Sequence, residues 1–271
     1  MRRLALATML IAVGAAVSAL GGGPDLQYCD PLKSTLCSST QVAFMFEEDN
    51  DRARYDSQTG MVALEPDGYS VARRAGKVGS YAVDFAGNEN SHLRLPGLSS
   101  VGPGYWTLAM WVYPDTSGSS GQEQTLLAND YKAQAGTHVY LYNNAGSLQL
   151  RITVTSNETN STVTAIAGSN LTVGAWNFVV VGASRWPTQY GQASLFAQVN
   201  NGTKGAATLT YAVRGTNYET FLGARALAAS GSRTPFDGGL DALNLFGDAL
   251  NAAQLTNLYN SGSGKAFPFV D

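Results

Sequence analysis

Short stretches with a strand pattern follow one another along most of this sequence, and they limit its fold more than any other feature does. Examples are "YAVDF", "YWTLAMWVYP", "HVYLYN", "LQLRITVT" and "WNFVVVGAS", separated by turns rich in Gly, Asn and Ser. About a dozen such strands, with no helices between them, predict two packed antiparallel sheets. The fold class that we expect is all-β, a two-sheet antiparallel jelly-roll sandwich.

The last segment, from Phe236 to Gly262, changes from strand spacing to helix spacing. Leucines alternate as in a strand up to Leu245, and apolar residues then recur three and four positions apart. Asn251 can cap this helix, with Gln254 reaching back to the cap, and Gly262 can end it. We therefore expect one short C-terminal helix that covers an end of the sandwich with Leu255, Leu258 and Tyr259.

The chain divides into three parts, of which the first is a hydrophobic N-terminus. Arg2 and Arg3 precede the run "LALATMLIAVGAAVSAL" and the break "GGGP". Residues 1–20 are therefore expected to be a signal peptide cleaved near Ala19, or an uncleaved signal anchor. Residues 21–40 form a leader, and residues 41–271 form the jelly-roll domain. Either alternative places the bulk of the chain outside the cytosol, secreted or at the cell surface.

Two further features agree with an extracellular location. Cys29 and Cys37 lie in the leader, and in an oxidising compartment we expect a disulfide between them, with two free thiols as the alternative. Closing this short loop would stabilise the fold by about 2–3 kcal/mol. Four N-x-Ser/Thr sequons are candidate glycosylation sites: Asn157, Asn160, Asn170 and Asn201.

Several motifs in order resemble the laminin-G-like jelly roll of the concanavalin A-like lectin and glucanase superfamily. In "AGKVGSYAVDFAGNENSHLRLPGL" the residues Gly76, Gly79, Phe85 and Gly87 fit the opening pattern, while Ala86 replaces the usual Asp. The stretches "YWTLAMWVYP", "TLLAND", "VGAWNFVVVGAS" and "FDGGLDALNLFGDALNAAQLTNLYNSG" are similar to the motifs that follow, and "VAFMFEEDNDRARYDSQTG" is similar to the first strand and turn. The resemblance runs from residue 42 to residue 262 and implies the same sandwich.

Catalysis is not expected, although the superfamily includes glucanases. Retaining glycosidases place two carboxylates about 5–5.5 Å apart across the sugar bond, and the sandwich glucanases carry them in a Glu-x-Asp-x-x-Glu pattern. The nearest run, Glu47 to Asp51, has Arg52 where the second Glu should stand, so a solvated loop is the better interpretation. The two histidines, His92 and His138, lie in separate strands without metal-ligand spacing. We predict no catalytic residues.

Calcium is the one cofactor that the resemblance implies. Many members of the family hold it with the Asp that begins the last strand, here Asp241, with backbone carbonyls and, in some members, with an Asp of the early turn, here Asp56. Oxygen ligands from separated loops suit calcium. The alternative is an Asp satisfied by turn amides, and Ala86 leaves a second site without its carboxylate.

Exposed aromatic side chains are the candidate ligand-binding residues. Trp186 and Tyr190 lie in the loop "SRWPTQYGQ", outside the family pattern, and we expect them to project from the sandwich. Tyr140 and Tyr142 share a strand face with His138 and could form a platform, with cross-strand packing as the alternative. Three tryptophans match scaffold positions and are expected in the core: Trp106, Trp111 and Trp176.

We therefore expect a secreted or surface-anchored, non-enzymatic module that recognises an extracellular glycan or protein, and the resemblance adds calcium as its candidate cofactor. The alternative is a structural subunit of an extracellular filament, coat or surface assembly, because low charge and many Thr, Tyr and Gly residues also suit self-assembly. A glucanase with disguised acids comes third. A net charge of −3 and no run of Lys or Arg longer than two residues indicate no nucleic-acid partner. Contact with a membrane is expected only through an uncleaved anchor.

Overall fold

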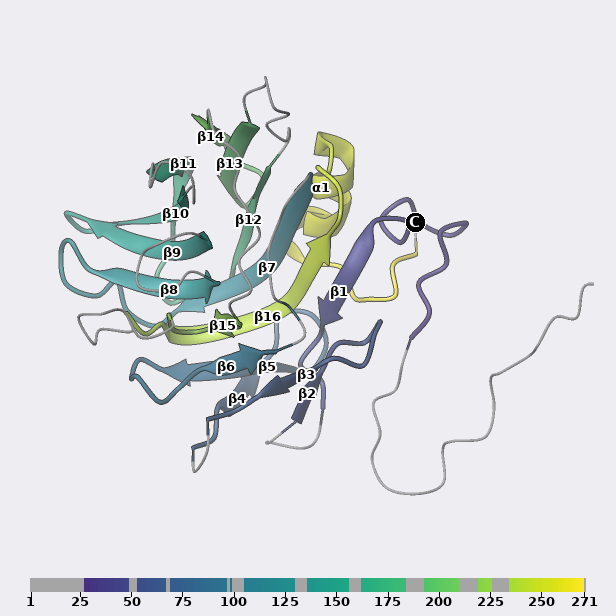
Figure 1. Ribbon diagram of the computed structural model, residues 1–271, viewed down its shortest axis with the longest axis horizontal. Helices are drawn as coiled ribbons and strands as arrows, with labels where there is room; N and C mark the ends of the chain where they lie inside the picture. Colours follow the sequence, from purple (N-terminus) through teal and green to yellow (C-terminus); the bar gives the residue numbers. More distant parts are fainter. Residues whose placement is uncertain are drawn as a thin grey trace, which may run out of the picture.

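The computed structural model is a sandwich of two eight-stranded antiparallel sheets with one short helix (Figure 1). It describes residues 27–48, 53–66, 69–96, 98, 105–129, 136–155, 162–183, 193–209, 219–225 and 234–270. The fold class expected from the sequence is confirmed. Within the described residues, no helix has the length and apolar content needed to span a bilayer.

The first sheet contains both ends of the strand sequence. Its strands are β1 (Thr40–Phe44), β4 (Ala72–Ala75), β5 (Tyr81–Ala86), β7 (Trp106–Pro114), β12 (Asn177–Ala183), β13 (Ala193–Val199), β14 (Gly205–Leu209) and β16 (Asp237–Phe246). They lie in the order β14-β13-β12-β7-β16-β5-β4, and β1 also pairs with β16. The last strand is thus hydrogen-bonded to the first.

The second sheet is built mainly from the middle of the chain. Its strands are β2 (Ala53–Tyr55), β3 (Val62–Leu64), β6 (Leu93–Leu95), β8 (Glu123–Ala128), β9 (Gly136–Asn144), β10 (Ser147–Thr155), β11 (Thr162–Leu171) and β15 (Thr220–Leu222). Their order is β11-β10-β9-β8-β15-β6-β3-β2.

The main hydrophobic core lies between the two sheets. Strand β10 contributes alternate residues, Leu148, Leu150, Ile152 and Val154, which is the period of a strand with one buried face. The first sheet contributes aliphatic side chains from β7 and β12, among them Leu108, Met110, Val179 and Val181. Burying each such side chain stabilises the fold by roughly 1.5–3 kcal/mol.

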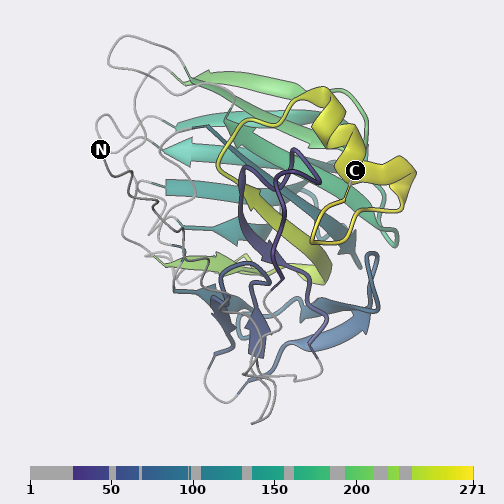
Figure 2. The same ribbon diagram turned by 90° about the vertical axis from the view of Figure 1, so that its right-hand side faces the viewer.

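A second hydrophobic cluster covers the outer face of the first sheet. Helix α1 (Ala252–Tyr259) lies across this face in Figure 2, with Tyr259 stacked 5.9 Å from Trp111 and 5.8 Å from the ring of Phe178. Leu255 and Leu258 are buried there as expected. The helix therefore covers a sheet face, where the sequence had indicated an end of the sandwich.

The helix begins as its sequence predicts and ends slightly earlier. Asn251 and Gln254 form a reciprocal capping box, each side chain accepting from the other residue's backbone N–H. Asn260 then takes a left-handed conformation, and a 3₁₀ turn over Asn260–Gly262 follows.

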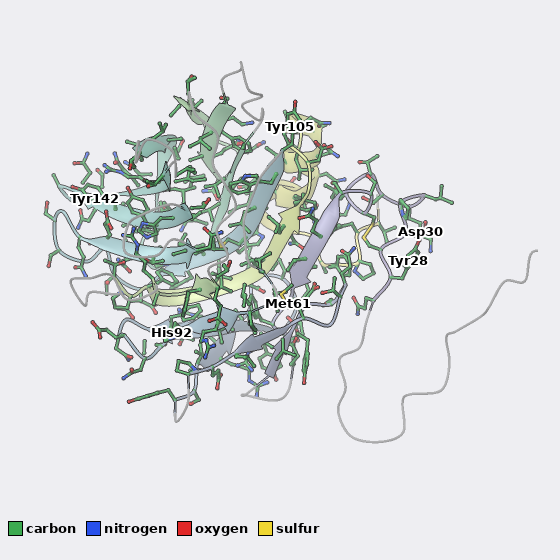
Figure 3. All side chains as sticks on the ribbon, in the orientation of Figure 1. Tyr28, Asp30, Met61, His92, Tyr105 and Tyr142 are labelled. Carbon is green, nitrogen blue, oxygen red and sulfur yellow. A yellow bond between two sulfur atoms is a disulfide. The ribbon has the colours of Figure 1, made fainter. Side chains whose placement is uncertain are left out.

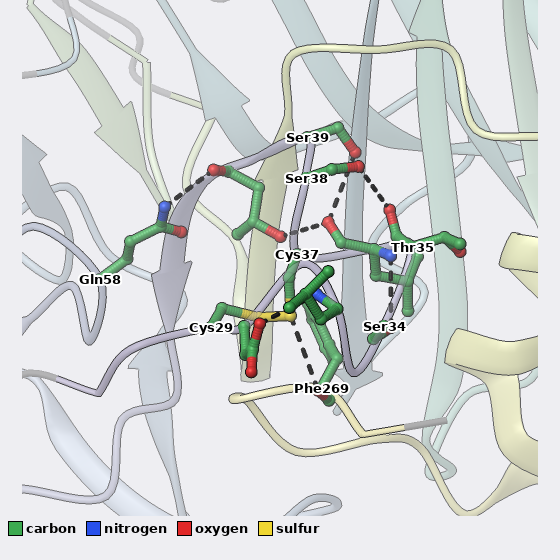
Figure 4. Close-up of a disulfide and its surroundings, with 12 residues drawn as sticks. Cys29, Ser34, Thr35, Cys37, Ser38, Ser39, Gln58 and Phe269 are labelled. Carbon is green, nitrogen blue, oxygen red and sulfur yellow. Dashed lines mark hydrogen bonds between the residues drawn. A yellow bond between two sulfur atoms is a disulfide. The ribbon is translucent and has the colours of Figure 1, made fainter.

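The leader belongs to the same cluster. Cys29 and Cys37 form the expected disulfide, with 5.1 Å between their Cα atoms (Figure 4). The Sγ atom of Cys37 lies 3.6 Å from the carbonyl oxygen of Phe269, and Leu36 is fully buried. Residues 27–40 therefore pack against the domain. Together with the C-terminal segment they cover part of the outer face of the first sheet.

These layers leave the two sheets in different environments. Strand β12 is buried along its whole length, because the core covers one of its faces and the second cluster covers the other. Strand β10 alternates between buried and half-buried residues. The outer face of the second sheet is thus the broad sheet surface that neither hydrophobic cluster covers.

Candidate functional site

The outer face of the second sheet carries aromatic and polar side chains where its inner face carries aliphatic ones. On β9, Val139 and Leu141 point into the core, so the residues between and beside them point outward. The pairing with β10 sets Tyr142 opposite Gln149 and Tyr140 opposite Arg151. The outer face consists of Glu123, Thr125, His138, Tyr140, Tyr142, Gln149, Arg151, Thr153, Thr164 and Ile166.

Tyr142 and Arg151 form the centre of this face. The guanidinium carbon of Arg151 lies 3.7 Å from the centre of the Tyr142 ring, which is a cation–π contact. Its Nη2 atom donates to Oε1 of Gln149 at 2.8 Å, while its Nε atom is buried without a hydrogen-bond partner. Both side chains are half-buried, and Tyr142 lies at the far left of Figure 3.

Tyr140 and His138 lie on the same face of β9 as Tyr142 and are more deeply buried. Their rings stack at 4.4 Å, and the Tyr140 hydroxyl lies 3.2 Å from Oγ1 of Thr153. Nε2 of His138 lies 2.9 Å from Oγ1 of Thr125, and burial, followed by the positive charge of Arg225, holds the pKa of His138 well below its usual value. His138 is therefore neutral. Tyr140 is only 6% exposed, so its contacts are those of the cross-strand packing alternative, and Tyr142 is the more accessible ring.

Sequence reasoning found the two tyrosines and missed Arg151. The signal was weak, because Arg151 is simply the one charged residue in "LQLRITVT". Its role depends on the β9–β10 register, which places it diagonally across from Tyr142. No pattern within one strand reveals that pairing.

The remaining aromatic candidates fall into two groups. Trp186 and Tyr190 lie outside the described residues, so their projection from the sandwich stays a prediction. Trp106 and Trp111 are buried in the two hydrophobic clusters, as expected, and Trp176 is half-buried, 5.5 Å from the ring of Tyr113.

Two of the four sequon asparagines lie in the described residues. Asn170 and Asn201 are exposed, so glycans could be attached there without disturbing the core. Asn157 and Asn160 lie outside the described residues.

Asp241, the main calcium candidate, is fully buried and surrounded by backbone amides. Its Oδ2 accepts from the N–H groups of Lys77 at 2.7 Å and Val78 at 2.8 Å, and its Oδ1 accepts from Ala242 at 2.7 Å. Burial raises the pKa of Asp241 to about 7, although these three hydrogen bonds oppose the shift; the charge of Glu47 adds to it. These contacts agree with the alternative to calcium, in which backbone amides satisfy the Asp241 carboxylate.

Asp56, the second calcium candidate, serves a different backbone segment. Its carboxylate accepts from the N–H groups of Ala43 at 2.6 Å, Gln58 at 3.1 Å and Thr59 at 2.8 Å, and from the Thr59 hydroxyl. It therefore closes its own turn and fixes β1. Across the described parts of the chain, no three His, Cys, Asp or Glu side chains converge as metal ligands. Bound calcium stays a prediction.

The acidic run also holds backbone. The Glu47 carboxylate accepts from Ser80 N–H at 2.9 Å and Tyr81 N–H at 3.1 Å. Oε1 of Glu48 accepts from Tyr55 N–H at 2.7 Å, and burial raises the pKa of Glu48. Asp49 lies outside the described residues. Both described acids therefore bind backbone N–H groups. This agrees better with the predicted loop than with a catalytic pair of carboxylates.

Among the hollows formed by described residues, two are alternatives to the outer face of the second sheet. One, of about 680 Å³, runs along β4 beside Arg73, Arg74 and Tyr81. Arg74 is neutralised there by Asp84 and Asp115, each 3.0 Å away. The other, of about 330 Å³, is polar and has no aromatic side chain in its lining, which runs from Gly87 and Thr116–Ser119 to Gln122, Gln124, Pro235 and Asp237. The first hollow also contains Tyr81 beneath Arg73, whose Nη1 donates to the carbonyl oxygen of Glu48 at 2.9 Å, so it is the rival site that a control variant must test.

Solved structures with the same architecture include three that are informative. The receptor-binding domain of botulinum neurotoxin type G superposes with a TM-score of 0.58 at 13% identity, over 83% of this chain and 51% of that chain. Domain 4 of AbnA, a GH43 extracellular arabinanase from Geobacillus stearothermophilus, solved with arabinotriose, gives 0.57 at 19% identity, over 80% and 97%. The botulinum neurotoxin serotype D ligand-binding domain, solved with N-acetylneuraminic acid, gives 0.57 at 13%, over 84% and 53%.

These likenesses concern the fold, and the chain spans about half the length of the toxin chains that it matches. A search of curated proteins found no significant match. The sequence profile described as concanavalin A-like lectin/glucanases superfamily matches residues 86–256, more than half of the chain. The matched segment contains six of the eight strands of the second sheet and the last strand. The chain therefore belongs to the concanavalin A-like lectin/glucanase superfamily.

Proposed function

We propose that this protein is a non-enzymatic, extracellular recognition module that binds a glycan on the outer face of its second sheet. The observation that carries the proposal is the pair formed by Tyr142 and Arg151, a half-buried ring with a half-buried cation over it, on the sheet surface that neither hydrophobic cluster covers. On the first sheet, helix α1 and the leader cover part of the outer face, and the comparable pair is Tyr81 with Arg73, 4.7 Å apart beside β4.

The chemistry of this face suits a sugar. A pyranose ring has apolar C–H faces that pack on an aromatic ring and hydroxyl groups that need donors and acceptors at its rim. Tyr142 supplies the ring, Gln149 and Glu123 lie opposite it on the neighbouring strands, and Arg151 supplies donors. Tyr140 and His138 keep the platform rigid, which reduces the entropy lost on binding.

The structural relatives support this class of ligand. Domain 4 of AbnA was solved with arabinotriose, and this chain corresponds to almost all of that domain. It is also part of an extracellular enzyme, which agrees with the secreted or surface location that the N-terminal sequence indicates. The sialic acid complex of the serotype D domain is weaker support, because the match spans only about half of that chain.

Binding to a glycan array, followed by calorimetry with the best oligosaccharide, tests the proposal. We expect Tyr142→Ala to weaken binding at least tenfold, which corresponds to about 1.4 kcal/mol. The matched control is Tyr81→Ala, since Tyr81 is also a half-exposed ring beneath an arginine, 4.7 Å from Arg73, on the other sheet. Loss of binding in Tyr81→Ala with none in Tyr142→Ala would move the site to the hollow along β4.

A second candidate function, a subunit of a surface assembly, is favoured by one observation. Three apolar side chains are exposed near the disulfide and the C-terminal segment: Tyr28 at 79%, Leu32 at 95% and Val270 at 59%. Tyr28 adjoins Cys29, and Val270 follows Phe269, whose carbonyl contacts Cys37. We call these three residues the apolar corner. Apolar groups exposed together often mark a contact with another molecule.

A further inference from the structure

Arg151 differs from the other arginines whose ion pairs are described on the two sheets. Arg74 pairs with Asp84 and Asp115, and Arg94 pairs with Glu219 through two parallel hydrogen bonds. Arg151 contacts an uncharged amide oxygen and an aromatic ring, and in the described part of the chain no carboxylate lies within ion-pair distance of it. Although Glu123 lies on the same face, Arg151 is thus a cation that no carboxylate of the described residues neutralises at ion-pair distance.

This arrangement is costly for the protein alone. A buried donor without an acceptor is destabilising, and the Nε–H of Arg151 is such a donor. Stacking on Tyr142 fixes the plane of the guanidinium group, and Gln149 holds one of its nitrogens. A planar fork fixed in this way is suited to a carboxylate, which can accept two parallel hydrogen bonds from it.

We propose that the glycan bound by this face is acidic and that Arg151 pairs with the carboxylate of one of its sugars. This inference rests on the proposed glycan-binding function. Tyr142 carries the guanidinium group on its ring, and Gln149 orients it. Glu123 lies opposite Tyr142 on the other side, from β8, so the negative group of the ligand is directed toward β10 and its hydroxyl groups toward β8.

The net charge of the chain is −3, so a general electrostatic attraction does not explain binding of an anion. Recognition must come from the local charge of Arg151. Binding of an acidic oligosaccharide should therefore weaken as salt is added, and this salt dependence should vanish when Arg151 is neutralised.

The test compares oligogalacturonic acid with its methyl-esterified form, which has the same sugar without the charge. We expect the acidic form to bind wild-type protein at least tenfold more tightly, and Arg151→Gln to abolish that difference. Arg151→Lys, which keeps the charge and loses the fork, should retain only part of it. Arg73→Gln is the matched control, because Arg73 stacks on Tyr81 of the first sheet. Thermal melting establishes that each variant is folded.

The outcomes separate this inference from the function on which it rests. Equal binding of the two forms, unchanged in Arg151→Gln, would overturn the acidic-sugar assignment and leave a neutral glycan module. Preference for sulfated sugars over carboxylated ones would overturn it as well. Binding to no glycan on the array would remove the proposed function and the assignment together.

Discussion

At the scale of single residues, the titration of Asp241 should be visible in the stability of the whole domain. Its pKa is raised from the ordinary value of 3.8 to about 7, chiefly because the carboxylate is buried. The protonated form therefore favours the folded state, and its contribution is complete below about pH 4 and is lost as the pH rises through about 7. The full change is on the order of 4 kcal/mol.

Asp241→Asn should remove this pH dependence. The variant loses some stability at every pH, because its NH₂ group faces a backbone N–H that had an acceptor. The readout is the slope: urea unfolding between about pH 4 and pH 7 should show wild-type stability falling relative to that of the variant. Parallel pH profiles would mean that the carboxylate is ionised throughout this range.

Calcium, if it binds here, would act on the same carboxylate. An ion held only by the folded state adds stability and favours the ionised form of Asp241. We expect added calcium to raise the melting temperature of wild-type protein near neutral pH, a chelator to lower it, and Asp241→Asn to respond to neither. Identical melting curves with calcium and with chelator would remove the metal site.

At the scale of elements, the disulfide-linked leader is a structural part of the domain. The Cys29→Ser/Cys37→Ser double variant loses the loop restraint, worth about 2–3 kcal/mol, and loosens Leu36 against the C-terminal segment. We expect a loss of that size in urea unfolding. Glycan binding by the folded variant should be unchanged, because the leader packs on the first sheet and Tyr142 lies on the second. A folded variant that has lost ligand binding would contradict this separation.

Comparison of the strands and the helix with the sequence shows which elements could be predicted. The long strands β7, β10 and β12 were predicted, because β10 alternates with one face in the core while β7 and β12 are apolar runs buried on both faces. Strands β2, β3 and β4 were missed because they carry too few alternating apolar residues, as "ARRA" in β4 shows, whereas the equally short β6, in "HLRLP", was predicted from its two leucines. The end of β16 was predicted, and so was the capping box of α1, since both are local signals.

Features that depend on contacts between distant segments could not be predicted from the sequence. The face covered by α1 is set by contacts of Tyr259 with Trp111 and Phe178, which come from different parts of the chain. The Arg151–Tyr142 contact likewise depends on register. The amide cradle of Asp241 joins Lys77 and Val78 to the last strand, more than 160 positions away, and was predicted only as an alternative to calcium.

At the scale of the whole molecule, the fold permits glycan recognition without hydrolysis. Glu47 and Glu48, the acids nearest to a glucanase pattern, are engaged by backbone amides of other segments. We expect no release of reducing sugar from β-glucans above that of a heat-denatured control. Turnover that persists through purification and disappears in Glu47→Gln or Asp49→Asn would overturn the non-enzymatic assignment.

The apolar corner and the outer face of the second sheet lie at opposite ends of the molecule, with Tyr28 at the right and Tyr142 at the left of Figure 3. If both surfaces are used, they should act independently, since no residue is shared between them. Leu32 is almost fully exposed, so Leu32→Ser should not change the stability of the fold. It should remove an apolar contact between copies of the chain.

We expect light scattering at increasing concentration to show self-association of wild-type protein that Leu32→Ser reduces and Tyr142→Ala does not. Calorimetry with the oligosaccharide should give the reverse pattern, because Tyr142→Ala removes the sugar platform while Leu32→Ser leaves it intact. A chain that stays monomeric at every concentration would reject the assembly candidate. Loss of glycan binding in Leu32→Ser would show instead that the two ends are coupled, and the glycan site would then have to be sought nearer the leader.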